Sequence, residues 1–364
     1  MRTFKQVVCC RFTVIVTLVE MASAGRAVAA TALIMLLGLP LAARAASPST
    51  FTVVALPDTQ YYSASYPYIF TSQTQWIVNN QTSQNIAFVA QQGDLVDDAK
   101  QPYQWTNADN AMYLLDNTSP RLPWGTCPGN HDMNQSPGAF AKAYDQNFGP
   151  SHFTGLSWYG GSYQNSSYQT FDAGGRQYLM LDLQYYPTYA RGDVFGWAQG
   201  VIDSHPGMPT IINTHDYLMT QDGRSDSGEA IWDSLVYPNE QVFTVFCGHM
   251  HGEYTQTSTD AAGKSVFELL ADFQEGPNGG NGYLRLYQFD EANSAIHVKT
   301  YSPYDTSGGT GGTYLTDADS QFDLAIDFDD RLGAAVPEPS TIALLGIAAV
   351  SLVAYAWRWR ARAS

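Results

Sequence analysis

The stretch Gly93-Asp94-Leu95-Val96-Asp97-Asp98 follows an apolar, strand-like segment at residues 86–90, and it decides how the rest of the chain is interpreted. A second polar stretch, Gly129-Asn130-His131-Asp132, follows a strand-like segment at 122–127. Glycine allows the backbone to turn sharply at such points. Because the carboxyl ends of strands in an open α/β sheet meet at one edge, these side chains are expected to form one site.

Three further segments repeat this arrangement along the chain. They are Asp58-Thr59-Gln60 after residues 51–56, Asn213-Thr214-His215 at the end of 210–213, and Gly248-His249-Met250-His251 after 241–247. Four of the seven histidines fall in the five polar segments taken together. A single histidine after a strand is more often a structural residue than a ligand, but five such segments in this order indicate a metal site.

The spacing of apolar residues predicts the fold class. Strand-like segments alternate with helical patterns at 69–79, 104–116 and 194–204, and further strands are expected at 178–183. From residue 266 onward the pattern changes to strands separated by turns, at 266–271, 283–289, 296–300 and 322–326. An α/β fold is therefore predicted, a sandwich of two mixed β-sheets flanked by helices.

The ordered set GDxxD, GNHD, a histidine after a strand, and GHxH resembles the calcineurin-like metallophosphoesterase superfamily, over roughly residues 51–255. The resemblance implies two divalent metal ions and assigns a role to each matching position. A general acid, or a group that stabilises charge on the leaving oxygen, is implied at His131, and Asp97 is implied to orient it. The implied ligands are Asp58, Gln60 and His251 for the first ion, Asp94 as the bridge, and Asn130, His215 and His249 for the second ion.

This ligand set suits phosphoester hydrolysis. Two ions about 3.5–4 Å apart need a bridging carboxylate, and they lower the pKa of a shared water so that a metal-bridging hydroxide attacks phosphorus. Mixed nitrogen and oxygen ligation favours Mn, Fe or Zn over Ca or Mg. The predicted function is a metal-dependent hydrolase of phosphomonoesters or phosphodiesters. The alternative is a non-catalytic surface or extracellular-matrix protein that retains the fold, and the presence of both His131 and Asp97 argues against it.

Three positions depart from better-known members of the superfamily. Gln60 stands where most members have histidine, which predicts a weaker first ion site or a preference for a harder ion such as Mn. Asp98 stands where protein Ser/Thr phosphatases carry a phosphate-binding arginine, and Asp97 where purple acid phosphatases carry a metal-binding tyrosine. With no phosphate-binding arginine in the motifs, diesters or small phosphorylated metabolites are favoured as substrates. Nearby aromatic and histidine side chains are interpreted as structural, namely Tyr61, Tyr62, His152, Trp158 and Tyr159.

The two ends of the chain are interpreted as sorting segments that flank a metallophosphoesterase domain at 46–335. Residues 1–45 contain a short apolar run at 29–42 followed by Ala43-Arg44-Ala45, which is typical of a signal peptide. Residues 336–364 begin with Val336-Pro337-Glu338-Pro339-Ser340, continue with an apolar segment long enough to span a membrane at 341–357, and end in an arginine-rich tail. This layout resembles the PEP-CTERM signal.

That second resemblance implies an exosortase-type sorting enzyme as partner and a Gram-negative bacterium as source. It also implies contact with the membrane through the C-terminal helix, at least transiently. The expected location is the periplasm, the outer cell surface or the extracellular matrix. A plain C-terminal membrane anchor is the alternative, and it would leave the catalytic domain on the same outer side.

The net charge of the chain limits its possible partners, and its cysteine content is low. The chain has 18 basic and 34 acidic residues, and without residues 1–45 and 336–364 the counts are 10 and 32, a net charge of −22. Such a surface repels polyanions, so duplex nucleic acid is disfavoured as a partner. Cys127 and Cys247 remain outside the sorting segments, and the sequence leaves open whether they form a disulfide or are two buried thiols.

Overall fold

The computed structural model of the chain describes residues 50–136, 138–190, 192–304, 312–335 and 351. The predicted signal peptide lies outside these ranges, as does the predicted membrane-spanning segment except for Ser351. Within the described ranges, no helix is both long enough and apolar enough to cross a bilayer.

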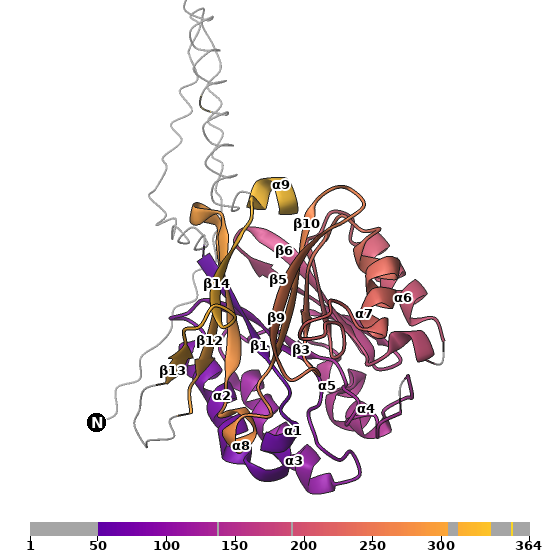
Figure 1. Cartoon of the computed structure of the whole chain (residues 1–364), viewed down its shortest axis with the longest axis vertical. Coiled ribbons are helices and arrows are strands. Elements are labelled where there is room, and N and C mark those ends of the chain that lie inside the picture. The colour runs from indigo at the N-terminus through magenta and orange to yellow at the C-terminus, as the bar shows by residue number, and fades with distance from the viewer. Residues whose placement is uncertain (1–49, 137, 191, 305–311, 336–350, 352–364) are drawn as a thin grey trace, which may run out of the picture. The chain divides into compact units, whose positions relative to one another are not determined.

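Two mixed β-sheets form the centre of the domain (Figure 1). The first sheet has the order β13 (Thr313–Leu315), β12 (Ala295–Ser302), β11 (Leu284–Asp290), β1 (Thr50–Leu56), β2 (Ile86–Gln91) and β3 (Trp124–Thr126), with β14 (Gln321–Ala325) also paired to β12. The second has the order β4 (Tyr159–Tyr163), β5 (Ser166–Ala173), β6 (Arg176–Leu183), β7 (Thr210–Thr214), β8 (Val242–Cys247), β10 (Ser265–Asp272) and β9 (Gly252–Thr259). Parallel pairs occupy β1–β2–β3 and β6–β7–β8–β10, and the remaining pairs are antiparallel, so the predicted fold class is confirmed.

Helices cover the outer face of each sheet (Figure 1). The first sheet packs on α1 (Gln60–Ser65), α2 (Pro67–Asn80) and α3 (Pro102–Met112), and the second on α6 (Val194–Ser204) and α7 (Asp226–Ile231). Side chains of β1 alternate accordingly: Val53 and Ala55 lie in the core between the sheets, whereas Val54 and Leu56 pack on the helices. A strand buried on both faces needs an apolar run rather than an alternating one, which explains the sequence of β1.

Aromatic rings fill the space between the two sheets. Phe51 stacks on Phe289 with ring centroids 4.5 Å apart, and Tyr178 of the second sheet meets Phe289 edge to face at 6.1 Å. Phe246 and Tyr287 stack across the same layer at 4.3 Å. This contact fixes the separation of the sheets and therefore the position of the strand ends that carry the polar segments.

The segment between β3 and β6 contains further helices and strands. The segment around His152 and Trp158 contains α4 (Lys142–Phe148), α5 (Pro150–Phe153), β4 and β5. His152 stacks on Tyr113 at 4.3 Å and pairs with Asp116 at 3.1 Å, which agrees with a structural role.

The helix expected at 104–116 divides into α3 and a 3-10 turn, η1 (Tyr113–Asn117). The remaining short helices are η2 (Pro187–Tyr189), η3 (Trp232–Val236), α8 (Pro277–Gly280), η4 (Glu291–Asn293) and α9 (Phe328–Leu332).

The two domain cysteines answer the question that the sequence left open. Cys127 and Cys247 are both buried and both free. Cys127 lies just past β3, and Cys247 is the last residue of β8. They therefore act as small apolar side chains in the packed interior.

Phe289→Ala is expected to destabilise the domain by about 3–5 kcal/mol, because the ring is fully buried between the sheets and its loss leaves a cavity. Urea unfolding followed by tryptophan fluorescence measures the change. Phe140→Ala is the matched control, since that ring is 47% exposed and its truncation should change stability by less than about 0.5 kcal/mol. Equal effects of the two substitutions would contradict the assignment of Phe289 to the core.

Candidate metal centre

The polar segments meet where the carboxyl ends of the parallel strands of both sheets lie side by side. Asn213 at the end of β7 donates from Nδ2 to the Gln91 carbonyl of β2 at 3.0 Å. His215 donates from Nδ1 to the carbonyl of Gln92 at 3.0 Å. The second bond fixes the tautomer of His215 and leaves Nε2 with its lone pair available to a ligand.

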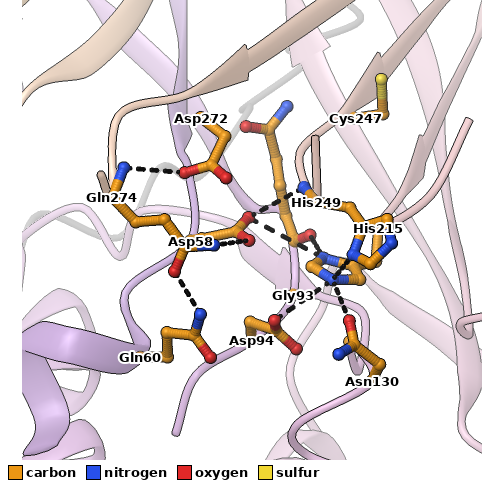
Figure 2. A network of polar contacts seen from close by, with 12 residues as sticks. Asp58, Gln60, Gly93, Asp94, Asn130, His215, Cys247, His249, Asp272 and Gln274 are labelled. Atoms are coloured by element: carbon orange, nitrogen blue, oxygen red, sulfur yellow. Dashed lines mark hydrogen bonds and ion pairs between the residues drawn. The ribbon is translucent and has the colours of Figure 1, made fainter. Parts of the chain in front are cut away.

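Three predicted metal ligands, including the expected bridge Asp94, surround this Nε2 atom (Figure 2). From His215 Nε2, Asn130 Oδ1 lies at 2.9 Å, His249 Nδ1 at 3.1 Å and Asp94 Oδ2 at 3.3 Å. Two ligands that each lie about 2.1 Å from one ion are about 3.0–3.4 Å apart at angles between 90° and 109°. The spacing and the donor types therefore fit a divalent transition metal. Asp58 joins the same group, since ligand atoms of Asp58, Asp94 and His215 lie within 4.8 Å of one another.

Local backbone geometry brings the carboxylates this close. Asp94 and His249 both adopt left-handed conformations, with φ of 49° and 70°. Such φ values are costly for residues with a side chain and cluster at functional sites. Glycines make room beside them: a Cβ at Gly129 would lie 2.1 Å from Asp94 Oδ1, and one at Gly248 would lie 2.2 Å from Asp58 Oδ1. The glycines of both motifs are thus required by close approach to the carboxylates.

The predicted ligands of the first ion lie together beside this group. Asp58 is buried and accepts from the backbone N–H of His249 at 3.3 Å. Gln60 donates from Nε2 to the side chain of Gln274, while its own Oε1 is buried and has no hydrogen-bond partner among the described residues. His251 Nε2 lies 2.8 Å from the amide nitrogen of Gln274. A buried carbonyl oxygen without a donor fits a bound cation, so this group also suits a metal ion.

Electrostatics follow from burying these groups together. Burial, followed by the charge of Asp272, raises the pKa of Asp58 well above its ordinary value. Burial would also raise the pKa of Asp94, but the charge and hydrogen bond of His215 bring it below the ordinary value. Although burial lowers it, the pKa of His215 rises to about 10 because Asp94 and Asp58 favour its cation. Burial and the charge of His215 lower the pKa of His249 to about 3. A divalent ion in place of the His215 proton would offset the same carboxylates.

His131 stands at the rim of the site, with 26% of its side chain exposed. Its backbone N–H donates to Asp94 Oδ1 at 2.9 Å, and its Nδ1 donates to the carbonyl oxygen of Asp97 at 2.5 Å. The Asp97 carboxylate is farther away, at 3.4 Å. Asp97 therefore holds the ring mainly through its main chain, and the ring can present Nε2 to a ligand. Asp98, in place of an arginine, accepts from Lys100 N at 3.0 Å and shapes the turn before α3.

The structure adds residues that the sequence analysis quoted without a role or did not mention. Asp132 is buried, and its carboxylate accepts from the backbone of Leu95 (3.1 Å), Val96 (3.1 Å) and Gly129 (2.9 Å), which ties the two central loops together. Gln104 of α3 accepts from the backbone of Asp97 at 2.8 Å and supports the same loop. Asp132 was visible as the fourth residue of GNHD, whereas Gln104 gave no signal.

Two further residues, Asp272 and Gln274, reach the first ion group from the end of β10. That strand was expected within the β-rich tail, where the sequence motifs assign no ligands. In the structure β10 is parallel to β8, so its carboxyl end reaches the same edge. The sequence signal was an apolar strand followed by Asp-x-Gln, the pattern also found at Asp58-Thr59-Gln60.

Asp132→Asn is expected to destabilise the domain by about 1–3 kcal/mol, because an amide group would face backbone N–H donors that now share a carboxylate. Chemical denaturation measures the loss, and hydrogen exchange at Leu95 and Val96 should become faster. Asp172→Asn, at an exposed position on β5, provides the matched control. Unchanged exchange at both amides would show that Asp132 does not hold the loops together.

The chain is similar to a curated protein and to several solved structures. The chain is 39% identical over 290 residues to the uncharacterised protein YvnB of Bacillus subtilis (strain 168), an alignment that covers 78% of this chain and 22% of the relative. The chain thus spans about a fifth of the length of that curated relative. Among solved structures, a purple acid phosphatase from yellow lupin (Lupinus luteus) seeds has a TM-score of 0.51 at 13% identity, covering 80% of this chain and 57% of that chain. A dimetal phosphatase from Danio rerio has a TM-score of 0.45 at 14% identity, covering 73% and 98%.

Sequence profiles of two families match separate parts of the chain. The PEP-CTERM protein-sorting motif matches residues 335–361, at the predicted sorting segment. The calcineurin-like phosphoesterase profile matches residues 51–253, which include all five polar segments. The chain therefore belongs to the calcineurin-like phosphoesterase family.

Proposed function

We propose that the chain is an exported phosphoesterase that uses two divalent metal ions to hydrolyse phosphate esters. The observation that carries this proposal is the convergence of Asp94, Asn130 and His249 on His215 Nε2, with His131 held beside them. Family membership and the fold of the phosphatase neighbour support it. The PEP-CTERM match supports export to the cell surface and processing by an exosortase-type enzyme.

Each role that the family resemblance implies falls on a residue whose surroundings suit it. Asp94 would bridge the two ions, because ligand atoms of Asp58, Asp94 and His215 lie within 4.8 Å of one another. Asn130, His215 and His249 would hold the second ion, and Asp58, Gln60 and His251 the first. When bound, the two ions would activate a water and offset the negative charge that develops on the phosphate. The mixed nitrogen and oxygen donors favour Mn, Fe or Zn as the bound ions.

His131 is suited to act on the leaving group. Its Nδ1 proton is committed to the carbonyl of Asp97, so Nε2 is the atom that can hold or deliver a proton. The ring is partly exposed, whereas His215 is fully buried. The leaving oxygen of an ester that binds from the solvent side would therefore lie near His131.

The surroundings of the site favour a diester or another weakly charged ester. A pocket of about 310 Å³ adjoins the first ion group and is lined by His251, Asp272, Glu275, Phe273 and Tyr283, among others. Its described lining residues include two carboxylates and no lysine or arginine. Such walls repel a second phosphate charge and accept a neutral or cationic alcohol, so a phosphodiester fits better than a highly charged substrate.

His131→Ala is expected to lower the rate of ester hydrolysis by about 10²–10⁴-fold, the usual contribution of a general acid, while both ions stay bound. Turnover of bis-(p-nitrophenyl) phosphate and p-nitrophenyl phosphate by the Mn²⁺-loaded chain measures the rate, and elemental analysis measures the metal.

His297→Ala is the control, because His297 pairs with Asp323 on the outer part of the first sheet. The proposal fails if the wild-type chain holds two ions and hydrolyses neither ester. That outcome would favour the non-catalytic surface or matrix protein.

Gln60→His is expected to raise the preference of the first site for Zn²⁺ over Mn²⁺ by roughly tenfold, the scale at which changes around metal ligands alter affinity. Imidazole is a stronger donor to zinc than a neutral amide oxygen. Competition between the two ions, read by elemental analysis, measures the preference. An unchanged ratio would mean that Gln60 does not bind the ion.

A further inference from the structure

Two Asp-x-Gln segments face each other at the first ion group. Asp58-Thr59-Gln60 follows β1 in one sheet, and Asp272-Phe273-Gln274 ends β10 in the other. The amide of Gln274 touches Gln60, lies 2.8 Å from His251 Nε2 and lies 3.5 Å from Asp58 Oδ2. The segment from β10 therefore contacts all three residues that would bind the first ion (Figure 2).

One oxygen of the Asp272 carboxylate accepts a hydrogen bond, and the other has no described hydrogen-bond donor. Its Oδ1 accepts from the backbone N–H of Gln274 at 2.9 Å. Its Oδ2 is buried and has no hydrogen-bond partner among the described residues. Asp272 as a whole is only 2% exposed, so solvent does not supply a donor either. A bond within its own loop explains Oδ1 alone. A buried carboxylate oxygen without a donor is costly unless a cation binds it.

Distances place this free oxygen within the first ion group. Asp272 Oδ2 lies 3.9 Å from His251 Nε2. Two ligands about 2.1 Å from one ion are about 3.0 Å apart at a right angle and about 4.2 Å apart on opposite sides, so 3.9 Å lies within the range of a shared ion. The nearest basic groups are imidazoles, since the described ion pairs of Asp58 and Asp272 involve His215 and His251.

We propose that Asp272 is a ligand of the first metal ion, through Oδ2, and that it compensates for the weak neutral donor at Gln60. The inference rests on the two-ion site of the proposed function. Asp272 would add a negative charge where Gln60 supplies none. Gln274 is a positioning residue: its backbone N–H orients the Asp272 carboxylate, and its side chain aligns Gln60 with His251. An oxygen-rich first site of this kind favours a harder ion such as Mn²⁺ over Zn²⁺.

The test compares Asp272→Asn with the wild-type full chain in calorimetric titrations with Mn²⁺. The wild-type chain is expected to bind two ions. The variant should bind one ion with unchanged affinity and the other at least about 10-fold more weakly, the scale reported for losses around metal ligands. Asp260→Asn is the matched control, because Asp260 is also buried but lies in the turn after β9, where it pairs with Arg331. It should bind both ions as the wild type does.

Thermal melting separates a ligand from a merely structural carboxylate. In EDTA, Asp272→Asn should melt at or above the wild-type temperature, because one of several buried like charges is gone. With Mn²⁺, the wild type should gain more than the variant. Asp272→Glu, which keeps the carboxylate, should recover part of the Mn²⁺ affinity that Asp272→Asn loses.

Three outcomes would overturn the inference. Asp272→Asn could bind both ions with wild-type affinity, or it could lose the same stability with and without Mn²⁺, and in either case Asp272 is not a ligand while the two-ion function stands. If the wild-type chain itself binds no Mn²⁺, the proposed function fails together with the inference.

Discussion

The burial of several carboxylates at one sheet edge is the constraint on which the rest of the site depends. Asp58, Asp94 and Asp272 are each at most 3% exposed, and within the described part of the chain their paired basic groups are the histidines His215 and His251. Buried like charges repel each other strongly in a medium of low polarity. The packing of the two sheets holds them in place, and divalent cations are the groups that would balance them.

Packing far from the site makes this edge possible. The stacked aromatic rings between the sheets set the spacing of β2 and β7, at which Asn213 donates a hydrogen bond to the Gln91 carbonyl. Once the strand ends are fixed, the loops have little freedom. Asp132 joins two of them through backbone N–H groups, and glycines at 129 and 248 admit the carboxylates at contact distance. Stability of the core and geometry of the site are therefore coupled.

Much of this could be predicted from the sequence because strand exits carry short, chemically distinct motifs. The strands before Asp58, Asp94 and His215 were expected within two residues of their observed bounds. The pairing of strands that lie far apart in the sequence could not be predicted. Nothing local to residues 265–272 indicates that this strand runs parallel to β8, so Asp272 and Gln274 could not be placed at the edge. Likewise, the contact of His131 with the Asp97 carbonyl is a main-chain contact, which a side-chain motif does not encode.

The two ion groups differ in a way that bears on how substrate reaches them. The second group is rich in nitrogen and centred on His215, which is fully buried and packs edge to face against His249 and Tyr185. The first group is rich in oxygen and borders solvent at His251, whose side chain is 39% exposed. His131 is also partly exposed, with 26% of its side chain accessible. A phosphate that enters between these two rings would approach Asp94, the proposed bridge, with its alcohol group either toward His131 or in the pocket beside His251. Because that pocket is walled by carboxylates and aromatic rings, the part of the substrate placed there is best uncharged or cationic.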